Sequence, residues 1–104
     1  MISRSELRLA SPGKTAGKGY MSDRFYYVYL LRSIRFPEHT YIGFTEDLEQ
    51  RVKDHNRGAS VHTAPFKPWR LVNTHAFVDQ AKAKEFEQYL KSGSGRAFGK
   101  RHLW

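Results

Sequence analysis

The chain has 104 residues, 39% of them hydrophobic and 14% aromatic, which predicts one folded domain with a modest core. It has no cysteine, so a disulfide scaffold and a thiolate zinc site are excluded, and this composition fits a cytoplasmic protein. The formal net charge of +8 indicates a polyanionic partner, most simply nucleic acid, although a basic protein without such a partner is an alternative. No apolar run is long enough to span a bilayer, so a membrane protein is not expected.

The N-terminal segment differs in composition from the remainder of the chain. Residues 1–24 hold five basic residues against two acidic ones, are rich in small and polar residues, and show no apolar period. We interpret residues 1–24 as a flexible basic tail that precedes a domain over residues 25–104. Met21 stands just before the first predicted strand and is a second candidate for the start of the protein.

Two strands are predicted at the start of this domain. Aromatic and branched residues favour a strand over Phe25–Ser33, and a similar pattern returns over His39–Phe44. The segment 34–38 contains Pro37 and predicts a turn. Because the turn is short, the two strands are expected to pair as an antiparallel hairpin.

A helix is predicted directly after the second strand. Thr45 can cap its first turn, where Glu46 and Asp47 would suit the helix dipole. The helix is expected to continue to Asn56 and to end at Gly58.

A third strand is predicted over Trp69–Phe77, and Asp79 is a candidate cap for a second helix that ends at Lys91. The Ser-Gly-Ser-Gly run over 92–95 predicts a break before a short terminal helix over Arg96–Trp104. The order ββαβα plus this terminal helix predicts an α+β fold, in which a small three-stranded antiparallel sheet is flanked by helices. The stripe of the second helix that should face the core holds Ala83, Phe86 and Leu90.

Chemically capable side chains lie beside the apolar stripe of the first predicted helix. Leu48 and Val52 are four residues apart and should face the core, and Arg51 and His55 lie next to them at the same spacing. Gly43, shortly before this helix, would let the backbone approach another element or a phosphate closely. An arginine and a histidine next to the core indicate a functional site.

Plainer interpretations exist for the same features. Tyr29 and Tyr41 could be strand aromatics that pack across the hairpin. Glu87 borders the apolar stripe of the second helix, and it could simply pair with Lys91 one turn later.

Several short motifs occur in a fixed order along the predicted domain. They are Tyr27-Val28-Tyr29, then Tyr41-Ile42-Gly43-Phe44-Thr45 with Arg51 and His55-Asn56, then Pro68-Trp69-Arg70-Leu71-Val72, and finally Ala83-Lys84-Glu85-Phe86-Glu87. In these motifs the chain resembles the GIY-YIG nuclease superfamily. It is similar to small stand-alone bacterial members and to the N-terminal nuclease domain of the excinuclease.

The resemblance implies a metal-dependent endonuclease that hydrolyses DNA phosphodiester bonds. It further implies selectivity for DNA structure, a role in DNA repair or recombination, and Mg²⁺ or Mn²⁺ as cofactor. A partner protein or a homodimer would supply specificity, because the chain has no separate recognition domain. The alternative is a nucleic-acid-binding module that keeps the nuclease fold without cutting.

Five catalytic residues follow from the resemblance. Glu87 would hold the divalent cation, and Arg51 would clamp a phosphate oxygen. Tyr29, Tyr41 and His55 would position or deprotonate the attacking water, and it stays open which of the three is the general base.

Further residues are expected to support the site or to bind nucleic acid. Gly43 and Asn56 would support the site. The C-terminal segment over 91–104 has no acidic residue and is predicted to contact DNA phosphates, with a solvated terminal helix as the alternative. The cations predicted to bind nucleic acid are Lys53, Arg57, Lys67, Arg70, Arg96, Lys100 and Arg101.

Overall fold

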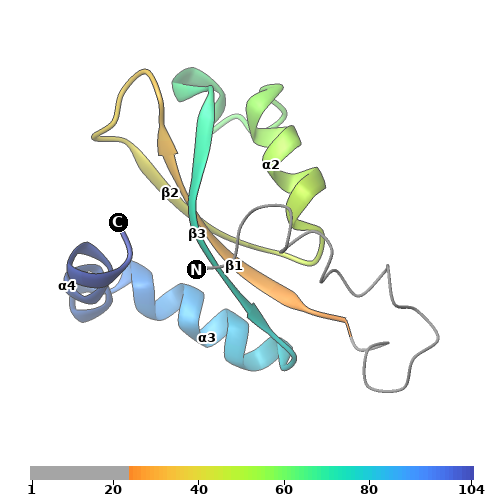
Figure 1. Ribbon diagram of the computed structural model, residues 1–104, viewed down its shortest axis with the longest axis vertical. Coiled ribbons are helices and arrows are strands. Elements are labelled where there is room, and N and C mark those ends of the chain that lie inside the picture. Colours follow the sequence, from red (N-terminus) through yellow and green to blue (C-terminus); the bar gives the residue numbers. More distant parts are fainter. Residues whose placement is uncertain (1–23) are drawn as a thin grey trace.

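A three-stranded antiparallel sheet forms the centre of the protein (Figure 1). The computed structural model describes residues 24–104, so the predicted tail lies outside the described residues except at its last position. The strands are β1 (Tyr26–Ser33), β2 (Thr40–Thr45) and β3 (Trp69–Phe77), in the spatial order β2-β1-β3. This confirms the predicted antiparallel hairpin and places β2 and β3 at the edges.

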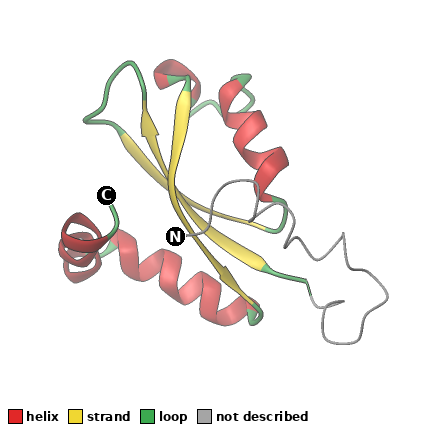
Figure 2. Cartoon of the chain, in the orientation of Figure 1, coloured by secondary structure: helices red, strands yellow, loops and turns green. Residues whose placement is uncertain are grey.

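Helices cover both faces of this sheet (Figure 2). They are α2 (Leu48–Asn56), the short 3₁₀ helix η3 (Ala64–Phe66), α3 (Gln80–Lys91) and α4 (Gly93–His102). The predicted α+β order ββαβα with a terminal helix is therefore confirmed. Within residues 24–104, no helix has the length and apolar character that a membrane crossing requires.

The alternation of side chains along β1 divides the core into two clusters. Val28 and Leu30 point to the side of α3 and α4, whereas Tyr29 and Leu31 point to the side of α2. All four side chains are at most 1% exposed, because β1 is the central strand and is covered on both faces. Figure 1 shows α2 on one side of the sheet and α3 with α4 on the other.

The cluster under α3 is apolar and follows the predicted stripe. Ala83 and Leu90 are buried against Val28 and Leu30, and Phe86 packs at its margin. Burial of one such aliphatic side chain stabilises the fold by about 1.5–3 kcal/mol. This face therefore supplies much of the hydrophobic stabilisation of the domain.

The predicted start of the first helix is wrong by two residues. Asp47, not Thr45, is the N-cap, and its carboxylate accepts a hydrogen bond from the Gln50 amide at 3.2 Å. The Thr45 hydroxyl instead accepts from the Asp47 amide at 3.1 Å. Glu46 and Asp47 accordingly precede the helix. The Thr45 hydroxyl is engaged in this local turn and cannot cap the helix.

The predicted four-residue break after α3 is also wrong, since α4 begins at Gly93. Ser92 alone separates the two helices, and its hydroxyl accepts a hydrogen bond from the Gly95 amide while donating to the Tyr89 carbonyl. A Cβ atom at Gly95 would overlap the backbone of Tyr89 and Leu90. Glycine is therefore required for so tight a corner, and packing overrides the weak helix propensity of this segment.

Candidate active site

Tyr29 of β1 and Tyr41 of β2 lie on the face of the sheet that α2 covers. Their ring centroids are 6.1 Å apart. Gly43 pairs directly opposite Tyr29, and a Cβ atom at position 43 would overlap the Tyr29 phenol group. Glycine at position 43 therefore leaves room for the Tyr29 side chain. The group that closely approaches its backbone comes from the neighbouring strand β1.

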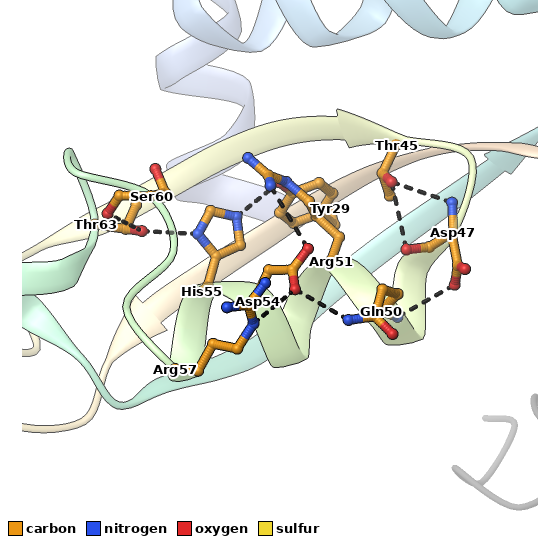
Figure 3. A network of polar contacts seen from close by, with 10 residues as sticks. All are labelled: Tyr29, Thr45, Asp47, Gln50, Arg51, Asp54, His55, Arg57, Ser60 and Thr63. Atoms are coloured by element: carbon orange, nitrogen blue, oxygen red, sulfur yellow. Dashed lines mark hydrogen bonds and ion pairs between the residues drawn. The ribbon is translucent and has the colours of Figure 1, made fainter.

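His55 of α2 is fully buried against the tyrosines, and both of its ring nitrogens have partners (Figure 3). Nε2 lies 2.9 Å from the Tyr29 hydroxyl oxygen, and Nδ1 lies 2.8 Å from Oγ1 of Thr63. Thr63 Oγ1 in turn lies 3.5 Å from the carbonyl oxygen of Ser60. A continuous polar chain thus runs from β1 through α2 to the following loop.

The acceptor at the end of this chain determines the direction of its hydrogen bonds. The Ser60 carbonyl can only accept, so the Thr63 hydroxyl donates to it and accepts from Nδ1–H of His55. Nε2 then carries a lone pair and accepts the proton of the Tyr29 hydroxyl. The network therefore assigns His55 as the neutral Nδ1–H tautomer.

Burial keeps the Tyr29–His55 pair uncharged near neutral pH. Burial raises the pKa of Tyr29 to about 12, although the neighbouring Arg51 partly opposes this shift. Burial also lowers the pKa of His55, and the positive charge of Arg51 lowers it further. Tyr29 is consequently a poor general base at neutral pH, and its hydroxyl acts as a hydrogen-bond donor.

Tyr41 and Arg51 are the solvent-facing members of this group. Tyr41 is half-buried, and its ring centroid lies 4.9 Å from that of His55. The Arg51 side chain is 36% exposed and meets Asp54 only at 4.0 Å, whereas Arg57 lies 3.1 Å from the same carboxylate. The Arg51 guanidinium is therefore only weakly paired with Asp54, lies next to the Tyr29 hydroxyl, and can still contact an anion from the solvent side.

Asn56 and Trp69 join the end of α2 to the start of β3. The Asn56 side chain accepts a hydrogen bond from the Trp69 amide and donates one to its carbonyl. The Trp69 indole donates to the carbonyl of Thr63 at 2.9 Å. These bonds hold the Thr63 loop against His55. Nothing in the sequence singles out Thr63, because a loop residue carries no periodic signal.

Glu87 lies on α3, across the sheet from His55. Its side chain is 18% exposed, and its Oε2 lies 2.7 Å from Nζ of Lys91. The structure thus gathers four of the five predicted catalytic residues on the α2 face. It places the fifth, Glu87, in the ion pair that the sequence offers as the plainer interpretation.

A groove beside β2 is lined by residues of β1, the turn after it, β2, α3 and α4. Tyr41 from the α2 side and Lys91 from α3 both line this groove, together with residues of α4 and the C-terminal Trp104. Because Lys91 is bound to Glu87, the carboxylate lies one side chain behind the groove wall. Tyr41 and Lys91 therefore line one groove, although the Tyr41 ring packs on the α2 face and Glu87 lies on α3.

A divalent cation at Glu87 would have few protein ligands. Among residues 24–104, no group of three or more His, Asp or Glu side chains is arranged to hold a metal ion. A cation at Glu87 would therefore take most of its ligands from water and phosphate, which is common for Mg²⁺ and unlike zinc. Lys91 is 49% exposed and could move aside from the carboxylate.

The cations predicted to bind nucleic acid are all exposed. On α4, Arg96 and Lys100 line the groove at the β2 edge, whereas Arg101 does not. The complete set is Lys53 and Arg57 on α2, Lys67 and Arg70 around the start of β3, and Arg96, Lys100 and Arg101 on α4.

Comparison with known proteins gives related sequences in fungi and insects. The chain is 36% identical over 86 residues to a structure-specific endonuclease subunit SLX1 of Candida dubliniensis, covering 76% of this chain and 29% of the relative. A structure-specific endonuclease subunit SLX1 homolog of Drosophila mojavensis is 38% identical over 72 residues, covering 61% and 24%. The chain thus spans less than a third of the length of these curated relatives.

One solved structure and one family profile also match this chain. The solution NMR structure of a UPF0213 protein from Bacillus halodurans is 32% identical with a TM-score of 0.43, covering 70% of this chain and 79% of that one. The profile of the GIY-YIG catalytic domain matches residues 25–101, which is most of the chain. The chain therefore belongs to the GIY-YIG family, as its tyrosine motifs and their spacing predict.

Proposed function

We propose that residues 25–104 form a metal-dependent endonuclease that hydrolyses phosphodiester bonds in DNA. The observation that carries this proposal is the half-buried pair Tyr41 and Arg51 beside the buried hydrogen bond between Tyr29 and His55. Hydrolysis needs a positioned water and positive charge at the phosphate, and this pair offers both. Binding alone would not need an oriented, buried histidine beneath the surface.

The four residues divide into two kinds. Arg51 is proposed to contact the scissile phosphate, since its planar guanidinium suits two phosphate oxygens. Tyr41 is proposed to position the attacking water with its hydroxyl. Tyr29 and His55 are buried, so they are proposed as positioning residues that hold the Tyr41 ring and α2 in register.

Glu87 is proposed to complete the site from the other side of the β2 edge. It would hold Mg²⁺ or Mn²⁺ through a carboxylate oxygen once Lys91 moves away. With a divalent cation bound there, the scissile phosphate would be polarised and the leaving oxygen stabilised. The central claim is therefore one active site built from both faces of the sheet.

The substrate and setting are proposed from the names of the relatives. Those proteins are named structure-specific endonuclease subunits, which supports cleavage selective for DNA structure, in repair or recombination. The word subunit also supports a partner protein as the source of specificity, with a homodimer as the other candidate. Residues 1–24 as a basic tail and a cytoplasmic location remain predictions.

The exposed cations are proposed to contact the phosphate backbone of the substrate. Each such contact would contribute to a fall in affinity as salt is raised. Binding that does not weaken between low and high salt would exclude these contacts.

The Glu87–Lys91 ion pair favours a second candidate function. A carboxylate neutralised by a lysine 2.7 Å away competes poorly for a cation, so the domain could bind nucleic acid without cutting. This candidate predicts binding of DNA by the native chain with no cleavage in Mg²⁺ or Mn²⁺.

A nuclease assay separates the two candidates. Plasmid, single-stranded, flap and junction DNAs would be incubated with the wild-type chain and with Arg51→Ala, Glu87→Gln and Glu85→Gln variants. Glu85 is an exposed acid on the same helix and serves as the matched control. We expect the first two substitutions to slow cleavage by about 100-fold or more, and Glu85→Gln to leave it unchanged. Absence of cleavage by the wild type, with binding intact, would favour the second candidate.

A further inference from the structure

The groove beside β2 combines basic and aromatic residues in one lining. It runs between β2 and α4, and we call it the β2–α4 groove. Its lining holds four basic residues, of which Lys91 is paired with Glu87, one acid, Glu38, and two aromatic residues. The cations and rings are Arg32, Lys91, Arg96, Lys100, Tyr41 and Trp104.

We infer that the β2–α4 groove binds one unpaired strand of nucleic acid, an assignment that rests on and extends the proposed function. Cations that follow a backbone, alternating with aromatic rings, are the usual means of holding a single strand. Within this lining, the Arg32 guanidinium carbon lies over the Trp104 ring, 5.6 Å from its centroid, and makes a cation–π contact. Tyr41, the half-buried tyrosine of the candidate active site, also lines the groove.

The chemistry of the lining favours an unpaired strand over a duplex. Basic residues of β1, α3 and α4 surround the groove, and Trp104 adds an aromatic ring on which an unpaired base can stack. A duplex would rest across the mouth and leave the rings without a partner, because its bases are paired and stacked. An unpaired arm lying in this groove leads directly to Tyr41 and, behind Lys91, to Glu87.

Helix α4 provides a matched test, because its cations lie on different sides. Arg96 and Lys100 are one turn apart and line the groove, whereas Arg101 is equally exposed and does not. Substitution of any of the three by alanine removes one positive charge from the same helix. An effect of overall charge would therefore be equal for all three variants.

The experiment measures binding of a single-stranded oligonucleotide and of the matching duplex by fluorescence anisotropy, without divalent ions. We expect Arg96→Ala and Lys100→Ala each to weaken single-strand binding about fivefold at 0.1 M salt and to reduce the salt slope by about 0.7. Arg101 does not line the groove, so Arg101→Ala should weaken single-strand binding less than either groove variant and should weaken duplex binding by the same factor. Thermal unfolding of each variant shows whether α4 is intact.

Tryptophan fluorescence gives a second readout on the full chain. The protein has two tryptophans, and Trp69 is only 4% exposed. Quenching by the oligonucleotide should therefore come from Trp104 and should disappear in Trp104→Phe. Quenching that persists in this variant would contradict contact between the oligonucleotide and Trp104.

Each outcome distinguishes this inference from the proposed nuclease. Equal losses for all three α4 variants, or no loss for Arg96→Ala and Lys100→Ala, would overturn the groove as a binding site. Equal losses on duplex and single strand for the two groove variants would overturn the assignment to an unpaired strand. If the expected binding pattern holds but wild type cuts no DNA in Mg²⁺ or Mn²⁺, the groove stands and the nuclease does not.

Discussion

The buried side chains on the two faces of the sheet differ in polarity. On the α3 side, Val28, Leu30, Ala83 and Leu90 form a buried cluster with no polar side chain among them. On the α2 side, the buried groups include the hydroxyls of Tyr29 and Thr63 and the ring of His55. The same strand, β1, supplies both faces by simple alternation.

This difference distinguishes burial that stabilises the fold from burial that orients functional side chains. Apolar burial on the α3 side lowers the free energy of the fold in proportion to the area removed from water. Polar burial on the α2 side gains little net stability, because each hydrogen bond replaces one to water. What the α2 side gains is a histidine with both nitrogens engaged and a fixed orientation beneath Tyr41 and Arg51.

The largest effect on stability is expected from a substitution in the apolar cluster. Leu90→Ala should lower the free energy of unfolding by about 3 kcal/mol, because it removes a fully buried side chain and leaves a cavity. Urea denaturation followed by circular dichroism measures this change. A loss below about 1 kcal/mol would contradict the contribution expected of a fully buried leucine on the α3 side.

Two glycines of α4 sharpen the comparison at the corner between the helices. Gly95→Ala should destabilise the protein by about 2 kcal/mol, since the new methyl group would overlap the backbone of Tyr89 and Leu90. Gly93 has no atom within 4 Å of an added Cβ, so Gly93→Ala should be neutral or stabilise by about 0.5 kcal/mol. Thermal unfolding compares the two, and equal effects would show that packing at Gly95 is not the cause.

The two tyrosines should respond differently to loss of their hydroxyls. Tyr29→Phe leaves Nε2 of buried His55 without a partner and should destabilise the fold by about 1–2 kcal/mol. Tyr41→Phe should change stability by less than about 0.5 kcal/mol, because Tyr41 is half-buried, yet it should slow DNA cleavage. Paired unfolding and cleavage measurements would contradict this division if Tyr41→Phe destabilised as much as Tyr29→Phe.

The smallest predicted effect is a pH dependence of stability. Burial lowers the pKa of both His55 and His75 from the usual 6.5, so the unfolded chain binds more protons than the folded one. Stability should therefore be complete above about pH 6.5 and fall as the solution is acidified below it. His75→Gln should reduce this acid sensitivity, whereas the exposed His102→Gln should not; urea midpoints at pH 7.5 and 5.5 test both.

Much of the fold could be predicted from the sequence, because its elements follow local patterns. The third strand and the cap at Asp79 agree with the structure residue by residue. The start of α4 and the cap of α2 could not be predicted. They depend on a turn at Thr45 and on the packing of Gly95 against the end of α3, which local propensity does not contain.

The candidate site could be predicted only in part. Alternation and register place Tyr29 and Tyr41 on one face, and helical spacing adds Arg51 and His55. The hydrogen bond between His55 and Thr63 depends on a loop that the Trp69 indole holds in place. No periodic pattern in the sequence predicts that contact. Helical period also does not say which face of a sheet a helix covers, so the position of Glu87 across the sheet was not accessible.

The central claim is that Tyr41 from one face and Glu87 from the other belong to one active site at the β2 edge. A double-mutant cycle tests it most directly, using single-turnover cleavage of flap DNA by wild type, Tyr41→Phe, Glu87→Gln and the double variant. One shared site predicts that the double variant is about as slow as the slower single variant. Losses that multiply, or a Glu87→Gln variant that cuts at the wild-type rate, would contradict the claim.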